Sequence, residues 1–327
     1  RRLAYYQTVK RVGIMNNKPH LPVLLDQVVD VLTPKTGARY IDGTFGAGGY
    51  SRALLEAADC TVWGIDCDPS AIETGERLAN EFGGRLTFVN GRYGDMNSIL
   101  SDIGVTEIEG IALDLGVSSM QIDDPERGFS FREDGPLDMR MSKSGETAAD
   151  AVNKLAEREL ADIIYRYGEE RASRRVARAI VNLRTRTPIK RTQQLAEIVR
   201  GVVKHSRDGI DPATRTFQAL RIYVNDEIGE LERGLAAAES LLVPGGRLVV
   251  LSFHSLEDRC VKQFFKTRSG FAPLPSRHYP LNEVVSGAPT FKIFNRSTIR
   301  PTSAEISINP RARSARMRWG ERTGVVL

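Results

Sequence analysis

Cysteine and long apolar runs are scarce in this chain of 327 residues. The three cysteines, Cys60, Cys67 and Cys260, form no Cys-x-x-Cys pair and leave an odd count. The sequence therefore gives no sign of a disulfide framework or a zinc site, and we expect no metal. No apolar stretch approaches the roughly 20 residues that span a bilayer, so we expect a soluble protein with no membrane partner.

The overall composition is that of a globular protein, with 41% apolar and 27% charged residues. A net charge of +5 is mild for the whole chain, so the position of the positive charge matters more than its sum. Residues 1–18 carry five basic side chains and no acid. We expect a disordered leader there, with the remnant of an organelle-targeting sequence as the alternative.

A glycine-rich stretch, Asp42-Gly43-Thr44-Phe45-Gly46-Ala47-Gly48-Gly49, follows a short apolar segment, and the next apolar run ends in Asp66. Glycines allow a sharp turn after a strand and a close approach to a ligand. A carboxylate that ends the second strand accepts both hydroxyls of a ribose. Dinucleotides and S-adenosylmethionine share this pattern, but Ser51 stands where the dinucleotide fingerprint requires Gly or Ala. We favour a cofactor site over an ordinary strand-to-helix connection.

The periodicity predicts an α/β fold, a Rossmann-like sheet interrupted by an inserted helical domain. We expect a leader over 1–18, a domain built on the sheet over 19–120 and 221–327, and the insert over 121–220. A tight turn is predicted at Pro244-Gly245-Gly246 and an edge strand at 305–308. The other predicted strands lie near 39–42, 61–66, 85–90, 110–114 and 247–252, and the predicted helices near 49–58, 69–81 and 95–103.

The insert carries the clearest charge pattern, since residues 171–196 contain eight basic side chains and no acid. Arg171, Arg174, Arg175 and Arg178 fall at i, i+3, i+4 and i+7, which places them on one face of a helix, with Val176, Ile180 and Leu183 on the buried side. We favour phosphate binding over a merely solvated face. A second basic cluster near the C-terminus surrounds Trp319, and nucleic acid is the natural partner of both; its members are Arg311, Arg313, Arg316, Arg318 and Arg322.

Asp114 ends the fourth predicted strand, at the edge where open α/β sheets bind ligands. Hydrogen bonds accepted from an exocyclic base amine favour a nucleophilic geometry at its nitrogen, so Asp114 is a candidate for the reaction position, although it also suits a simple cap of the turn. Phe129 and Phe131 are candidates to stack on an unpaired base, with core packing as the commoner alternative.

Seven motifs give the chain a resemblance to the MraW-type family of 16S ribosomal RNA methyltransferases. In order they are DGTFGAGG, LDLGVSS, ERGFSF, DGPLDMRM, YGEER, ATRTFQALRI and SFHSLEDR, within a match that runs from His20 to Ser314. The resemblance implies S-adenosyl-L-methionine as methyl donor and transfer to the N(4) amine of a cytidine in the decoding region of 16S ribosomal RNA in the small subunit. It also implies an inserted domain that helps to recognise RNA.

The resemblance further implies which residues contact the cofactor. Tyr50 stands where relatives commonly carry His, and Tyr93 where Phe is frequent, so the side-chain role of Tyr50 is left open although its backbone amide still suits the cofactor. The implied contacts are Gly48, Gly49, Tyr50, Asp66, Tyr93, Asp114 and Gln121.

Several residues keep more than one interpretation. Asp114 accepts from the cofactor amino group or from the cytosine amine, and His254 contacts RNA, accepts a proton or serves as a structural hydrogen-bond partner. Arg140, with Asp138, resembles a family loop position that an ion pair explains equally well. Arg215 binds phosphate or pins the two domains together.

The sequence therefore predicts a cytoplasmic methyltransferase with direct transfer, and the mitochondrial matrix is the alternative location if the leader is a targeting remnant. No cysteine stands in a recognisable nucleophile context, which argues against methylation of a ring carbon. A nicotinamide-dependent oxidoreductase and a non-enzymatic ribosome-assembly factor with a cofactor pocket are the competing functions. Whether the protein forms a homodimer, and whether it acts on naked RNA or on a subunit, are left open.

Overall fold

The computed structural model describes residues 22–204, 209–270, 288–294 and 297–325. Its centre is a seven-stranded sheet with the order β3-β2-β1-β4-β5-β7-β6. The first five strands of that order are parallel, whereas β7 runs antiparallel between β5 and β6. The strands are β1 (Arg39–Asp42), β2 (Thr61–Asp66), β3 (Leu86–Asn90), β4 (Ile108–Asp114), β5 (Leu242–Ser252), β6 (Phe291–Lys292) and β7 (Arg316–Arg322).

The five parallel strands confirm the predicted α/β sheet. The predicted turn at residues 244–246 lies inside β5, because Ile108 pairs with Leu242 and Gly110 with Arg247. One residue of β4 therefore lies opposite four residues of β5, and the proline and glycines form a bulge in the strand rather than a turn before it.

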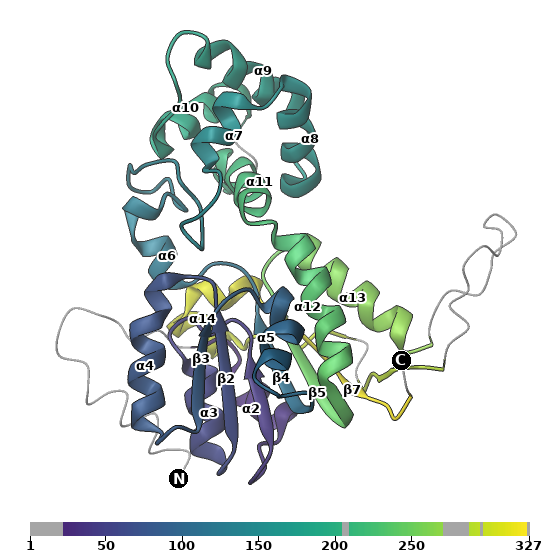
Figure 1. Cartoon of the computed structure of the whole chain (residues 1–327). Coiled ribbons are helices and arrows are strands. Elements are labelled where there is room, and N and C mark those ends of the chain that lie inside the picture. The colour runs from purple at the N-terminus through teal and green to yellow at the C-terminus, as the bar shows by residue number, and fades with distance from the viewer. Residues whose placement is uncertain (1–21, 205–208, 271–287, 295–296, 326–327) are drawn as a thin grey trace, which may run out of the picture.

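Helices cover both faces of the sheet, as Figure 1 shows. Alternate strand residues separate the two cores: Tyr40 and Val249 belong to one, Ile41 and Leu248 to the other. The first core includes side chains of α2 (Leu25–Leu32), α3 (Gly49–Ala57) and α4 (Ile72–Glu81). The second includes side chains of α5 (Met96–Asp102), α12 (Glu227–Leu241) and α13 (Ser255–Arg268). The predicted helices near 49–58, 69–81 and 95–103 are thus confirmed, the second beginning with a 3-10 turn, η1 (Pro69–Ala71).

A separate group of helices stands at one end of the sheet (Figure 1). It has its own apolar core, which includes Leu137, Val176, Ile180 and Leu220. The chain returns from this group to the sheet through α11 and α12. The division of the chain at residues 120 and 220 remains a prediction. The helices of the group are α7 (Ala148–Lys154), α8 (Glu157–Gly168), α9 (Ser173–Arg184), α10 (Thr192–Val202) and α11 (Ala213–Asn225).

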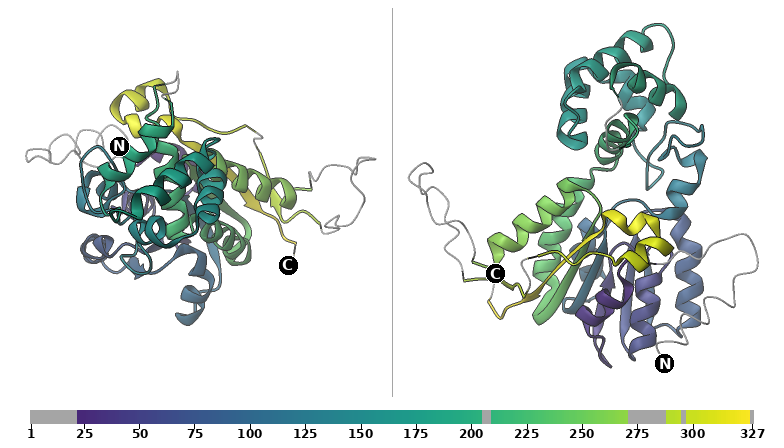
Figure 2. Two further views of the ribbon diagram at one scale, coloured as in Figure 1. Left: turned by 90° about the horizontal axis from the view of Figure 1, so that it is seen from above. Right: turned by 180° about the vertical axis from the view of Figure 1, so that it is seen from behind.

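The C-terminal part differs from the sequence prediction. Residues 305–308 belong to a helix, α14 (Ser303–Ile308), and not to an edge strand. The hydroxyl of Thr302 accepts the backbone N–H of Glu305, and Ile308 is 65% exposed, so a capped helix replaces the strand that the Ile306–Ile308 alternation predicted. Figure 2 shows α14 near the end of the sheet that faces the helical group.

The leader over residues 1–18 lies outside the described residues. Within the described part of the chain, no helix is long and apolar enough to cross a membrane.

Candidate active site

A pocket of about 380 Å³ lies where the glycine-rich stretch, the ends of β2 and β4, and helix α12 meet. Its lining includes six of the seven predicted cofactor residues: Gly49, Tyr50, Asp66, Tyr93, Asp114 and Gln121. The seventh, Gly48, is not among the lining residues. The sequence prediction therefore places most of its candidates around one cavity.

The glycine-rich stretch forms the floor of this pocket by a turn that only glycine tolerates. Gly48 has φ +74°, and a Cβ there would lie 2.3 Å from the Leu78 side chain and 2.7 Å from the Phe45 ring. Gly46 has φ +50° and also lines the pocket, with only a backbone oxygen 3.9 Å from its would-be Cβ. Gly48 thus keeps the turn tight, while Gly46 leaves open space for a ligand.

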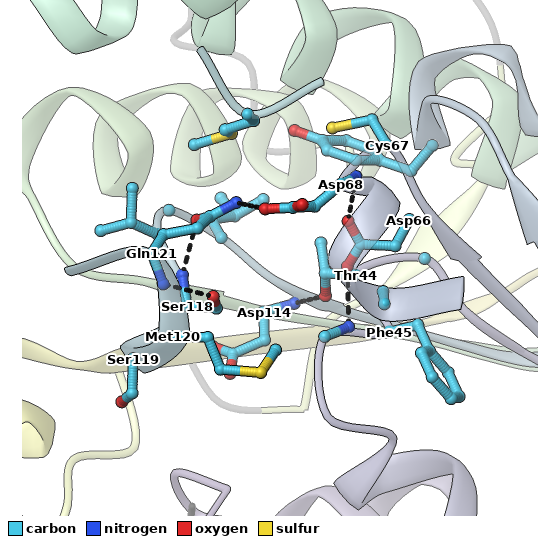
Figure 3. Close-up of a pocket in the computed structure, with 18 of the residues that line it drawn as sticks. Thr44, Phe45, Asp66, Cys67, Asp68, Asp114, Ser118, Ser119, Met120 and Gln121 are labelled. Carbon is cyan, nitrogen blue, oxygen red and sulfur yellow. Dashed lines mark hydrogen bonds between the residues drawn. The ribbon is translucent and has the colours of Figure 1, made fainter. Parts of the chain in front are cut away.

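Asp66 is held in place by two backbone groups. The N–H of Gly46 donates to its Oδ2 at 2.7 Å, and the N–H of Asp68 donates to its Oδ1 at 2.8 Å (Figure 3). Burial raises the pKa of Asp66 although these bonds lower it. Each carboxylate oxygen keeps a lone pair, so the group is placed to accept from the two hydroxyls of a ribose.

Gln121 begins the next wall, in α6 (Ser119–Asp123). Its Oε1 accepts the N–H of Ser118 at 2.9 Å, and its Nε2 donates to Asp68 Oδ2 at 2.7 Å (Figure 3). Asp68 also receives Arg127 Nη1 at 2.8 Å, and both members of that pair are almost fully buried. These partners fix the amide of Gln121 in one orientation at the pocket.

Tyr93 lies in a 3-10 turn, η2 (Tyr93–Asp95), between the pocket and α12. A Cβ on Gly234 would lie 2.4 Å from the Tyr93 ring, so the glycine lets α12 pack directly on it. Burial raises the pKa of Tyr93 well above its ordinary value. The ring therefore presents a neutral, immobilised aromatic surface to the pocket.

Asp114 is the most perturbed acid of the pocket. Its Oδ1 is buried and has no hydrogen-bond partner among the described residues, while the Tyr50 hydroxyl lies 3.3 Å from Oδ2. That hydroxyl also donates to Val23 O at the shorter distance of 2.6 Å. Burial and then the nearby Asp42 raise the pKa of Asp114 to about 8. The pocket thus contains a buried acceptor that the protein leaves unsatisfied.

His254 lies beside the pocket rather than in its lining. It caps α13, since its Nδ1 accepts the N–H of Glu257 at 3.3 Å, and its Nε2 lies 3.0 Å from Glu257 Oε1 without hydrogen-bond geometry. Phe253 and Glu257 do line the pocket. The geometry suits the structural interpretation of His254, through which Glu257 is positioned, at least as well as direct contact with RNA.

Three potential metal ligands, Glu227, His254 and Glu257, offer atoms within 4.8 Å of one another. Both oxygens of Glu227 already accept from the Arg221 guanidinium, at 2.8 and 2.9 Å. We therefore read this group as an ion-pair network, and the absence of a metal remains a prediction.

The predicted RNA-binding arginines of the helical group lie on α9, just before it and at the start of α11. Arg174, Arg175 and Arg178 are exposed on α9, opposite its buried side, whereas Arg171 precedes the helix, so the predicted stripe begins one turn later than expected. Leu183 is only partly buried. Arg215 is about half exposed at the start of α11, with Nη1 3.9 Å from buried Glu170.

The other candidates are more engaged with the protein. Arg140 forms a two-bond ion pair with Asp138, at 2.8 and 2.7 Å. Arg311 lines the pocket and pairs with Asp123 of α6, and Arg313 is exposed. The remaining basic residues of the C-terminal cluster support β7: Arg316 and Arg318 pair with Asp258, and Arg322 donates to backbone carbonyls.

The two candidate stacking residues pack against the helical core. Phe131 makes an edge contact with Phe217, with ring centroids 4.8 Å apart, and the Arg200 guanidinium lies 5.5 Å from its centroid. Phe129 is partly buried against the same core, with Arg127 over its ring. Packing therefore accounts for both rings in this conformation.

Sequence reasoning missed four residues of the pocket region: Thr44, Asp68, Arg221 and Glu257. The hydroxyl of Thr44 accepts the N–H of Asp114 at 2.7 Å and so ties the glycine-rich stretch to β4. Asp68 caps η1 through the N–H of Ser70, and its position before Pro69 in the sequence indicates only such a cap. Glu257 follows His254 by three residues, the spacing of a capping box, but nothing local places Arg221 beside it.

Comparisons with known proteins show which family the chain resembles in sequence. The model of the MraW methylase family matches residues 17–323. The protein named ribosomal RNA small subunit methyltransferase H in Rhodospirillum centenum is 64% identical over 93% of this chain and 92% of its own length. Its namesake in Paramagnetospirillum magneticum is 60% identical over 94% and 97%, respectively.

A solved S-adenosylmethionine-dependent O-methyltransferase from Thermotoga maritima is a more distant neighbour. It is 9% identical with a TM-score of 0.42, over 96% of this chain and 71% of its own. A likeness at this level carries no argument about function.

Proposed function

Because the chain belongs to the MraW methylase family, we propose that it transfers the methyl group of S-adenosyl-L-methionine to the N(4) amine of a cytidine in the decoding region of 16S ribosomal RNA. The cofactor supplies an electrophilic methyl group on a sulfonium. The methyl group replaces one hydrogen of the amine, and the proton is released to solvent. The observation that carries the proposal is the unsatisfied Oδ1 of Asp114 in the pocket.

The pocket fits this cofactor in three respects. Asp66 offers two fixed oxygens to the ribose, and Tyr93 provides an aromatic surface for adenine. Gly46 leaves room for the methionine part of the cofactor. The amide of Gln121, which Asp68 orients, also lines the pocket.

Asp114 orients the acceptor amine. An exocyclic amine of cytosine has its lone pair delocalised into the ring, and a hydrogen bond from it to Oδ1 turns the nitrogen toward the methyl group. A carboxylate is the better acceptor, and the positive charge of the sulfonium favours its ionised form. Asp114 therefore acts as a catalytic residue by orientation, without a covalent intermediate.

The exposed arginines of α9 are proposed to contact the RNA backbone. Arg174, Arg175 and Arg178 share one face, and in the part of the chain that the structure describes only Arg178 forms an ion pair, with Glu157 at 3.4 Å. An unneutralised cationic face on a group of helices next to the pocket suits phosphates on either side of the target. Arg215 and Arg313 are candidates for the same role.

The names of the relatives support a ribosomal substrate, and we expect the protein to act on small subunits in the cytoplasm. An assembly factor that retains a cofactor pocket remains the competing function. The two differ in one respect, because only an enzyme forms a methylated nucleoside.

The test uses small ribosomal subunits that lack native modification, incubated with labelled S-adenosyl-L-methionine, with nucleoside mass analysis of the product. We expect label in N(4)-methylcytidine, and its loss in Asp114→Ala with cofactor affinity largely kept. Asp102→Ala, an exposed acid at the end of α5, is the matched control. Label in another nucleoside would replace the proposed substrate, and subunit binding without label would favour the assembly factor.

A further inference from the structure

The pocket has a second polar wall, which the proposed mechanism does not use. It is formed where α11 passes into α12 and where α13 begins, and includes Arg221, Asn225, Glu227 and Glu257. Nε of Arg221 donates to Glu227 Oε1 at 2.8 Å, and Nη2 donates to Oε2 at 2.9 Å. Both side chains are mostly buried, Arg221 being 17% exposed and Glu227 9%.

The ion pair fixes the orientation of Arg221 without using all its donors. A guanidinium has five N–H groups, and the pair with Glu227 uses two of them. Among the described residues, no acceptor forms a hydrogen bond with Nη1. Since Arg221 stays charged, its remaining N–H groups are available to an acceptor in the pocket.

The charges of this wall select the kind of acceptor. Two carboxylates, Glu227 and Glu257, accompany one guanidinium, so a phosphate would meet net negative charge. Burial raises the pKa of Glu257, but His254, Arg221 and the N–H of Phe253 lower it further, and its pKa is below its ordinary value. An uncharged group with a carbonyl oxygen therefore suits Arg221 better than an anion.

We propose that Arg221 is a specificity-determining residue that donates to the O2 carbonyl of the target cytosine, an inference that rests on the proposed function. Cytosine carries O2 and the N(4) amine at opposite ends of one edge. With the amine at Asp114 and O2 at Arg221, the base is held at both ends. Uracil would place a carbonyl oxygen instead of an amine against Asp114, which in its ionised form has no donor for it.

The test compares cytidine with 2-thiocytidine at the target position. Small subunits are reconstituted with 16S ribosomal RNA ligated from a synthetic fragment that carries either base, and kcat/KM for methyl transfer is measured. Sulfur is a poor acceptor, so we expect the wild type to lose roughly 30-fold on 2-thiocytidine. Arg221→Lys should lose roughly 100-fold on cytidine but less than about threefold more on 2-thiocytidine.

Two further variants separate this role from a structural one. Arg268→Lys alters an ion pair outside the pocket, between Arg268 of α13 and Glu239 of α12, and should keep the full effect of sulfur. Glu227→Gln keeps an acceptor for Arg221 but loosens it, and should reduce the sulfur effect in part. Affinity for S-adenosyl-L-methionine should stay within about twofold of wild type in all three.

A full sulfur effect in both Arg221→Lys and Glu227→Gln would overturn the assignment of Arg221. The absence of any methyl transfer by the wild type to unmodified subunits would instead contradict the proposed function. The two failures are therefore distinguishable in one series of assays.

Discussion

The cofactor pocket and the exposed face of α9 differ in how firmly the chain fixes their functional groups. In the pocket, Asp66 and Gln121 are each held by two hydrogen bonds, and Gly48 has no room for a side chain. On α9, Arg174 and Arg175 are exposed, and no partner for either is found among the described residues. The pocket is thus specified by backbone geometry and burial, whereas the α9 face is specified by charge alone. Changes of single atoms should therefore affect binding at the pocket, whereas binding at the α9 face should depend on its total charge.

The largest effect is expected from Gly48→Ala. Its Cβ would meet Leu78 and Phe45 at a left-handed φ, so the turn must open, and we expect affinity for S-adenosyl-L-methionine to fall at least about 100-fold. Calorimetric titration measures this. Gly84→Ala is the matched control, because Gly84 has φ +82° with no atom within 4 Å of its would-be Cβ. Equal losses in both variants would show that general strain, and not the turn, is responsible.

Asp114→Asn should change the pH dependence of stability. The folded pKa of about 8 lies above the ordinary 3.8, so between about pH 4 and pH 8 the native state holds a proton that the unfolded state has lost. The free energy of unfolding of the cofactor-free wild type therefore decreases over this range. Relative to the wild type, Asp114→Asn should gain more than about 2 kcal/mol between pH 5 and pH 9, as followed by urea denaturation.

Asp102→Asn provides the comparison for this measurement, because it makes the same substitution at a carboxylate that is exposed to solvent. A profile for Asp114→Asn that runs parallel to that of the wild type would mean that burial of Asp114 has no consequence for its protonation.

Gly234→Ala lies outside the pocket lining and should weaken cofactor binding by displacing Tyr93, which is part of the lining. The new Cβ would lie 2.4 Å from Tyr93, so the ring must shift, and we expect affinity for the cofactor to fall roughly tenfold. The double variant with Tyr93→Leu tests whether the Tyr93 ring causes this loss. If Gly234→Ala weakens cofactor binding equally when the ring is absent, Tyr93 does not transmit the effect.

The smallest effect per residue is expected on α9. Arg174→Gln with Arg175→Gln should lower affinity for small subunits roughly tenfold at moderate salt and reduce the slope of log K against log salt by about 2. Filter binding over a salt series measures both. Arg77→Gln with Lys262→Gln removes the same charge from exposed sites on α4 and α13, and an equal loss there would make the effect one of net charge.

The five parallel strands of the sheet could be predicted well from sequence, whereas the antiparallel strands β7 and β6 could not. β1 and β2 have the bounds that the apolar runs indicated, because parallel strands buried on both faces are locally apolar. β7 was missed because it carries three arginines whose partners lie far away in the chain. Arg316 and Arg318 pair with Asp258, and Arg322 donates to the backbone carbonyls of Glu239 and Thr290. A strand stabilised by distant partners has no local signal.

In the candidate site, too, residues with a local signal could be predicted, and residues brought in by distant elements could not. Asp66, Asp114 and the glycines stand at strand ends, where sheet topology alone brings them together. Arg221 and Glu257 come from helices whose approach depends on how α11, α12 and α13 pack, and the sequence spacing does not encode that. The C-terminal basic cluster was overestimated for the same reason, because sequence cannot show that most of its charges are paired within the fold.

The most direct test of the account measures affinity for S-adenosyl-L-methionine and for small subunits in both Gly48→Ala and the Arg174→Gln, Arg175→Gln variant. The account predicts that the glycine variant loses the cofactor and keeps the subunit within about twofold, and that the arginine variant does the reverse. Loss of both affinities in both variants would contradict it, since the pocket and the α9 face would then not be independently specified.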